Sequence, residues 1–134
     1  LGKIILLSTN KELTEQIEKI SANRQMRTST VLEEVSMGIS HSTIGRMIAE
    51  KWNFPEYIVE AISYHHSPLK SSEANRDIIF LTYLANSLCL IDEKKFDYFY
   101  LENEVLQRFN LLSEEKFNEM HEEFKKLYLK QSEF

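Results

Sequence analysis

The stretch HSTIGRMIAEKWNFPEYIVEAISYHH, residues 41–66, decides how this chain folds. It predicts two short helices separated by a break at Asn53-Phe54-Pro55. Proline disfavours helix at the residue before it, and its fixed φ suits the first turn of a new helix. We therefore expect one helix that ends near Trp52 and a second helix from Pro55 to about His66.

Apolar residues recur at helical spacing in both segments of this stretch, which predicts one buried face for each helix. In the second helix, Ile58 and Ile62 lead to His66 at four-residue steps, so the pair His65-His66 sits at the end of an apolar face. The buried stripe predicted for the first helix consists of Ile44, Met47, Ile48 and Trp52.

The composition is that of one soluble globular domain spanning residues 1–134, with 43% hydrophobic and 28% charged residues. Three glycines and two prolines are too few for the turns of an all-β protein. The net charge of −5 and the dispersed basic residues disfavour nucleic acid as a partner. No apolar run approaches the roughly 20 residues that span a bilayer, so no membrane association is expected.

The cellular setting is predicted from what the sequence lacks. A single cysteine excludes a disulfide framework and fits a reducing compartment, and no signal peptide is visible, so we expect a cytoplasmic protein. The sequence begins with Leu1 and not with methionine. We therefore expect it to be a piece of a longer protein.

The rest of the chain predicts helices and no confident strand, although residues 1–8 could be a buried strand or a helix end. Gly38 is a natural stop for the helix that precedes it, and Ser40 or Ser42 caps the next one. We expect a compact all-α, multi-helical bundle of about six or seven helices. The further helices are predicted over residues 11–24, 28–37, 76–91 and 102–109, and after Ser113 with Phe117, Met120, Phe124, Leu127 and Tyr128 inward.

Three histidines, His41, His65 and His66, are the candidate metal ligands. Imidazole is the commonest metal ligand, but adjacent residues on a helix point about 100° apart, so only one of the pair should reach a given centre. No fixed spacing connects an acid to them, and on spacing alone a structural role is favoured over a metal site. The acids nearest in the sequence are Glu56, Glu60, Glu73 and Asp77.

Other polar residues are better explained by packing or solvation than by chemistry. Asn86 lies in mid-helix, where a hydrogen bond in the core is favoured, and Cys89 is favoured as a packing residue. His121 lies among glutamates and is predicted on a solvated face. Because no phosphate loop, nucleophile elbow or zinc-protease motif is present, no catalytic residue is assigned.

Several short motifs together resemble the HDOD domain, an all-α module of bacterial signalling proteins related to the HD phosphohydrolases. The opening LGKII, residues 1–5, looks like the tail of the family element HDIGKL, with Leu for Ile, so the sequence would hold the C-terminal part of the domain. The likeness covers residues 1–91, and residues 92–134 would be a helical extension. The other motifs are His41-x-x-x-Gly45, Ile48-Ala49-x-Lys51-Trp52-x-x-Pro55, Ile62-x-x-His65-His66-x-Pro68 and Leu84-Ala85-Asn86.

The resemblance also bears on a metal site. In the related HD-GYP phosphodiesterases, His41, His65 and His66 would match metal-ligand histidines. The Gly-Tyr-Pro element is absent from residues 67–75, and the acidic ligand of the later helix corresponds to Asn86, whose amide binds a hard cation more weakly. A full binuclear site is therefore not expected, and the histidines would be a remnant of it, or a sensing or structural feature.

Two functions follow from the resemblance. The first is a regulatory, non-catalytic module of signal transduction that binds a protein partner or another domain of its own chain, with no cofactor expected. The second is a divergent metal-dependent phosphohydrolase acting on a nucleotide or cyclic dinucleotide, with iron, manganese or zinc at His41, His65 and His66. A nucleic-acid binder is a third and weaker hypothesis, which the net charge opposes.

Overall fold

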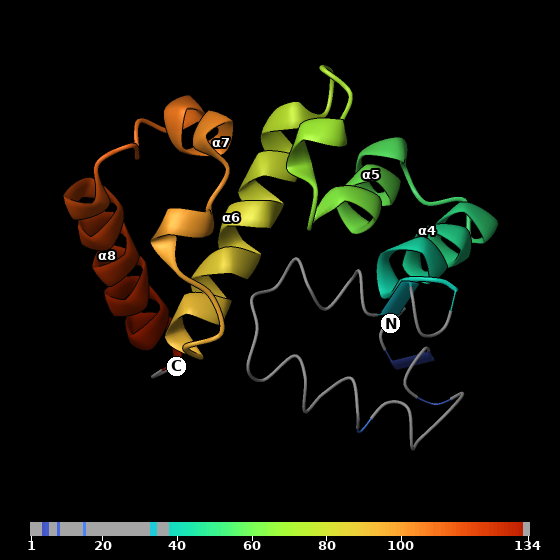
Figure 1. Cartoon of the computed structure of the whole chain (residues 1–134), viewed down its shortest axis with the longest axis horizontal. Coiled ribbons are helices and arrows are strands. Elements are labelled where there is room, and N and C mark those ends of the chain that lie inside the picture. The colour runs from blue at the N-terminus through green and yellow to red at the C-terminus, as the bar shows by residue number, and fades with distance from the viewer. Residues whose placement is uncertain (1–3, 6–7, 9–14, 16–32, 35–37, 133–134) are drawn as a thin grey trace. The chain divides into compact units, whose positions relative to one another are not determined.

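The structure is a computed structural model that describes residues 4–5, 8, 15, 33–34 and 38–132. Within those residues it contains α-helices and 3-10 turns and no strand, which confirms the all-α prediction. The helices predicted over residues 11–24 and 28–37 lie almost entirely outside the described residues. The elements in chain order are α4 (His41–Lys51), α5 (Glu56–Tyr64), η1 (Pro68–Lys70), α6 (Arg76–Asp92), η2 (Tyr98–Tyr100), α7 (Asn103–Arg108) and α8 (Glu114–Ser132), as labelled in Figure 1.

The chain divides into two compact units, residues 1–96 and residues 97–134. The first unit contains α4, α5 and α6, and the second contains α7 and α8. Each unit is described by itself, and a single domain over residues 1–134 stays a prediction. Within the described residues, none of the helices combines the length and the apolar composition needed to cross a membrane.

The start of α4 is fixed by a serine cap. Ser40 has extended backbone dihedrals, and its Oγ accepts a hydrogen bond from Thr43 N at 3.3 Å, so Ser40 and not Ser42 is the cap. Gly38 ends the preceding segment as predicted, with a φ of +73° and its amide donating to Glu34 O at 2.9 Å. The first residue of α4 is therefore His41, which the cap holds at the helix entrance.

The predicted break separates α4 from α5. Asn53 has a φ of +54°, which turns the chain, and the Pro55 carbonyl accepts hydrogen bonds from Ile58 N and Val59 N at 2.9 and 3.2 Å. The prediction that α5 continues to His66 is wrong, because the helix ends at Tyr64. His65 caps the helix and keeps helical dihedrals, with φ −62° and ψ −12°, and the amide of Ser67 donates to the Tyr64 carbonyl oxygen at 2.9 Å.

The face that α4 buries is made of small residues, Ser42, Gly45 and Ala49. The predicted stripe is wrong for Met47 and Trp52, each of which is 58% exposed. The reason is the close approach of α5. A Cβ added at Gly45 would lie 2.7 Å from Ile62 Cγ2, closer than real carbon atoms approach.

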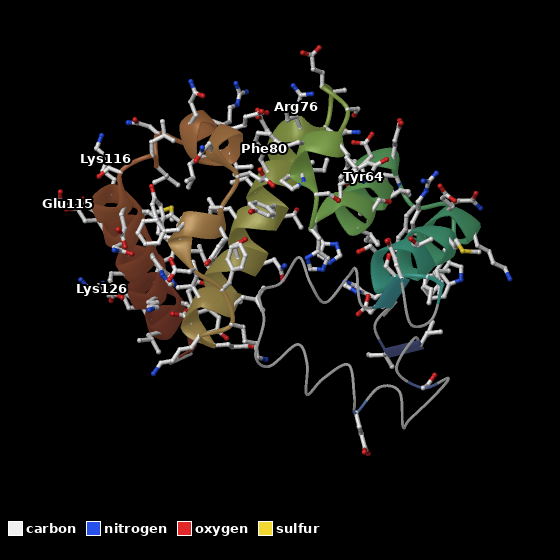
Figure 2. All side chains as sticks on the ribbon, in the orientation of Figure 1. Tyr64, Arg76, Phe80, Glu115, Lys116 and Lys126 are labelled. Atoms are coloured by element: carbon white, nitrogen blue, oxygen red, sulfur yellow. The ribbon has the colours of Figure 1, made fainter. Side chains whose placement is uncertain are left out.

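Helix α6 packs against α5 and η1 and is buried along one face. The opposite face of this apolar helix is open, since Ile78 and Leu81 are 40% and 52% exposed. Cys89 is also exposed, so the prediction that it packs in a core is wrong. The buried residues of α6 are Ile79, Phe80, Tyr83, Leu84 and Ser87, and Phe80 is labelled in Figure 2.

The second unit is centred on Tyr98 and Phe117, whose ring centroids lie 5.1 Å apart. His121 is 6% exposed, and its ring centroid lies 6.2 Å from that of Phe117, so the prediction of a solvated His121 is wrong. Only the first two turns of α8 have a buried face. The inward stripe predicted beyond Met120 is therefore wrong: Phe124, Leu127 and Tyr128 are exposed.

Candidate functional site

The three candidate histidines converge on one place. His41 Nε2 lies 3.2 Å from His65 Nε2 and 2.8 Å from His66 Nε2. The ring centroids of His65 and His66 are 4.0 Å apart. Tyr64, which Figure 2 labels, is the last residue of α5 and directly precedes the pair. Both imidazoles reach His41, so the expectation that only one of the two adjacent histidines would reach a given centre is wrong.

A buried carboxylate that the sequence did not single out lies behind His41. Glu33 is 2% exposed, and its Oε2 is 2.6 Å from His41 Nδ1 and 3.0 Å from the His41 backbone amide. A carboxylate only accepts hydrogen bonds, so His41 Nδ1 carries the hydrogen and Nε2 carries a lone pair. No spacing pattern in the sequence indicates the contact of Glu33 with His41.

The tautomer of His65 follows from the same reasoning. Its Nδ1 lies 2.7 Å from the carbonyl oxygen of Ile62, which can only accept, so Nδ1 donates and Nε2 carries a lone pair. Burial lowers the pKa of His65 from its ordinary value of 6.5, against the raising effect of the Ile62 hydrogen bond. His65 is therefore an uncharged donor of an electron pair at neutral pH.

The three nitrogens fit one metal ion. Zn–N bonds of about 2.0–2.1 Å in a tetrahedron place ligand nitrogens about 3.4 Å apart, close to the observed 2.8 and 3.2 Å. Within the described part of the chain, the potential ligand group contains His41, His65 and His66 and no carboxylate. Neutral imidazoles suit zinc and its neighbours better than hard magnesium or calcium. Glu33 would orient His41, as carboxylates behind ligand histidines do.

The acids named from the sequence are not part of this cluster. Glu60 Oε2 accepts hydrogen bonds from the backbone amide and hydroxyl of Ser72 at 3.2 and 3.0 Å. Glu73 is 3.9 Å from Arg76. Asn86 lies in the middle of α6 and is partly buried. Its correspondence to an acidic metal ligand stays a prediction.

Comparison with known proteins identifies a domain family that this chain matches. A model of the HDOD domain matches residues 1–68, which contain all three histidines. An uncharacterized protein of Treponema pallidum (strain Nichols) is 25% identical over 116 residues, which are 87% of this chain and 22% of that protein. The chain thus spans about a fifth of the length of this relative. No solved structure matches the chain significantly.

Proposed function

Since this chain belongs to the HDOD domain family, we propose that it is a regulatory module of signal transduction that does not itself catalyse hydrolysis. In this proposal it acts in the cytoplasm, and it binds a protein partner or another domain of the protein to which it belongs. The histidine cluster would be a structural or sensing centre within that module.

The proposal rests on the kind of ligand atoms that converge in this cluster, which are three imidazole Nε2 atoms. Metal centres that hydrolyse phosphate esters commonly hold two ions that stabilise the attacking and leaving oxygens. Carboxylates supply the negative charge that holds such hard ions. Here the described ligand group is three neutral nitrogens, and Glu33 reaches only the Nδ1 side of His41. Such a set suits one ion and not a pair.

An exposed apolar surface at the break between α4 and α5 supports binding to a protein. Met47 and Trp52 are each 58% exposed, and Phe54 and Tyr57 are each 43% exposed. The rings of Trp52 and Phe54 meet edge to face, with centroids 6.0 Å apart. Aromatic residues and methionine are enriched at the centres of protein interfaces, so this surface has the composition expected of a docking site.

A hydrolysis assay tests the proposal. The chain would be loaded with Mn²⁺, Fe²⁺ or Zn²⁺ and incubated with a nucleoside triphosphate, a cyclic dinucleotide and a simple phosphodiester. We expect no turnover above that of the His41→Ala variant. Metal-dependent turnover that His41→Ala abolishes and the exposed control variant Glu119→Gln retains would reject the regulatory proposal.

A divergent metal-dependent phosphohydrolase is the second candidate, and one observation favours it. Three histidine ligands leave a fourth tetrahedral position open, as in catalytic zinc sites. A bound metal would supply an acidified water molecule there. In that function His41, His65 and His66 hold the ion, and Glu33 keeps the His41 ring in place. The turnover described above would support this candidate.

A further inference from the structure

A second polar site adjoins the histidine cluster. A cavity of about 190 Å³ lies among the start of α4, the end of α5 and η1. Hydroxyl groups make up much of its wall, together with the cations Arg46 and Lys70. Glu34 is the one carboxylate among the described residues of the wall, and His66 belongs both to the wall and to the cluster. The Ser63 hydroxyl donates to the Val59 carbonyl oxygen, and the Ser40 and Thr43 hydroxyls bond to each other, so these three already have partners.

The main indication that the cavity binds a ligand comes from the hydroxyl group of Ser42. Ser42 lines the cavity and is 7% exposed, and its buried Oγ has no hydrogen-bond partner among the described residues. An unpaired buried hydroxyl costs free energy, so such groups are uncommon in folded proteins. A ligand oxygen in the cavity would satisfy the Ser42 hydroxyl.

The backbone at the start of α4 adds a second donor at the same residue. Of the first three helical amides, that of His41 donates to Glu33 and that of Thr43 donates to Ser40 Oγ. The amide of Ser42 is the remaining one. Amides at a helix N-terminus bind anions, because they lack intrahelical acceptors and lie at the positive end of the helix dipole.

The charges and the size of the cavity define the ligand. The described wall contains the cations Arg46 and Lys70 and the carboxylate of Glu34, and Nε of Arg46 also donates to Glu50 Oε1 at 2.7 Å. A volume of about 190 Å³ corresponds to roughly six water molecules. Pockets for drug-sized ligands are larger, about 300–1,000 Å³. The cavity therefore has room for a phosphate-sized oxyanion and not for a whole dinucleotide.

We propose that this cavity binds the phosphate group of a small ligand, with the hydroxyl and amide of Ser42 and the cations Arg46 and Lys70 as its donors. The ligand is a phosphomonoester or inorganic phosphate. This inference goes beyond the proposed function, because the cavity binds phosphate whether or not the chain hydrolyses anything. His66 connects the bound phosphate to the three-histidine cluster.

Titration of the full chain tests the inference, with metal removed by a chelator so that the histidine cluster cannot bind the anion through an ion. The probes are inorganic phosphate and ribose 5-phosphate, followed by calorimetry and by amide chemical shifts of Ser42 and Thr43. Binding of both probes indicates a phosphate-group site open to esters. Binding of inorganic phosphate alone identifies the free anion as the ligand.

The variants separate specific binding from general attraction to a positive surface. We expect Ser42→Ala and Lys70→Gln each to weaken phosphate binding about tenfold, because hydrogen bonds to a charged group are the strong ones. Lys51→Gln removes the same charge at the exposed end of α4, outside the cavity wall, and should change affinity less than about twofold. Equal effects of the three variants, no saturable binding, or binding only after metal is added would overturn the inference.

Discussion

His41 Nε2 and His65 Nε2 lie 3.2 Å apart, and the hydrogen bonds made by the two Nδ1 atoms leave a lone pair on each. Two lone pairs at this distance repel each other unless a proton or a cation lies between them. Burial disfavours the proton on His65, since it lowers the pKa of that ring. When both rings are uncharged, one metal ion would satisfy the two lone pairs at once.

The first prediction concerns Glu33. We expect the chain to bind one Zn²⁺, and Glu33→Gln to weaken that binding about 10–100-fold, because the carboxylate fixes the tautomer of His41 and raises its basicity. Competition with a chromophoric chelator measures the affinity. Glu34→Gln is the matched control, since Glu34 is the exposed neighbour in sequence. Equal affinities of the two variants would show that Glu33 does not position the ligand.

The second prediction is a loss of stability at acidic pH. Because burial lowers the pKa of His65 in the folded chain, the unfolded chain binds more protons between the folded pKa and 6.5. The contribution is fully present above about pH 6.5, and it is lost as the pH falls toward the folded pKa. Urea unfolding with a chelator present measures it.

A His65→Gln variant isolates the ring from the other groups that face it. Those groups are His41, His66 and Glu33. We expect the free energy of unfolding of the variant to fall less steeply below about pH 6.5 than that of the unmodified chain. An unchanged slope would mean that His65 does not titrate with folding.

The sequence predicted the parts of the site that depend on local chemistry. Pro55 marked the break, and the three histidines were named as a group. The sequence did not predict the contact of Glu33 with His41, because the two residues belong to different segments and meet only in the tertiary structure. The sequence also did not predict that both His65 and His66 reach His41, because adjacent residues of a helix were expected to point about 100° apart.

The burial of side chains was predicted least well where it depends on how closely a neighbouring helix packs. Hydrophobicity favoured Met47 and Trp52 for the inner face of α4, whereas the closeness of α5 selects small residues there. Periodicity shows which residues share a face, but it does not show how near the next helix comes. His121 was assigned to solvent because of its glutamate neighbours, although it lies four residues after Phe117 on α8 and therefore shares the inward face of that residue.

The third prediction tests that close approach. Gly45→Ala would bring a Cβ to 2.7 Å from Ile62 Cγ2, a stiff branch near the backbone. We expect a net loss of about 1–2 kcal/mol, because overpacking outweighs the gain in helix propensity of up to about 1 kcal/mol. When Ile62→Ala is also present, Gly45→Ala should lower the free energy of unfolding by less, or should raise it. Denaturant unfolding of the four chains measures the coupling, and additive costs would exclude the contact.

The fourth prediction concerns the second unit. The hydroxyl of Tyr98 donates to the carbonyl oxygens of Leu112 and Leu111, at 2.7 and 3.1 Å. Tyr98→Phe should therefore reduce the free energy of unfolding by about 1 kcal/mol. Tyr128 is 73% exposed, so Tyr128→Phe is the control and should change stability by less than about 0.5 kcal/mol. Equal small effects would show that the Tyr98 hydrogen bonds do not stabilise the fold.

The fifth prediction is that Ser42→Ala stabilises the chain when no phosphate is present. The buried Oγ has no hydrogen-bond partner among the described residues, and removing an unsatisfied hydroxyl recovers about 1 kcal/mol of its burial cost. Thermal unfolding in a buffer free of oxyanions measures this gain. With phosphate added, mass action should stabilise the unmodified chain more than the variant, because the variant binds phosphate about tenfold more weakly, so the variant's lead in melting temperature should shrink or reverse. A variant that is less stable in both buffers would show that the Ser42 hydroxyl already has a partner, and the case for a ligand at this residue would then be lost.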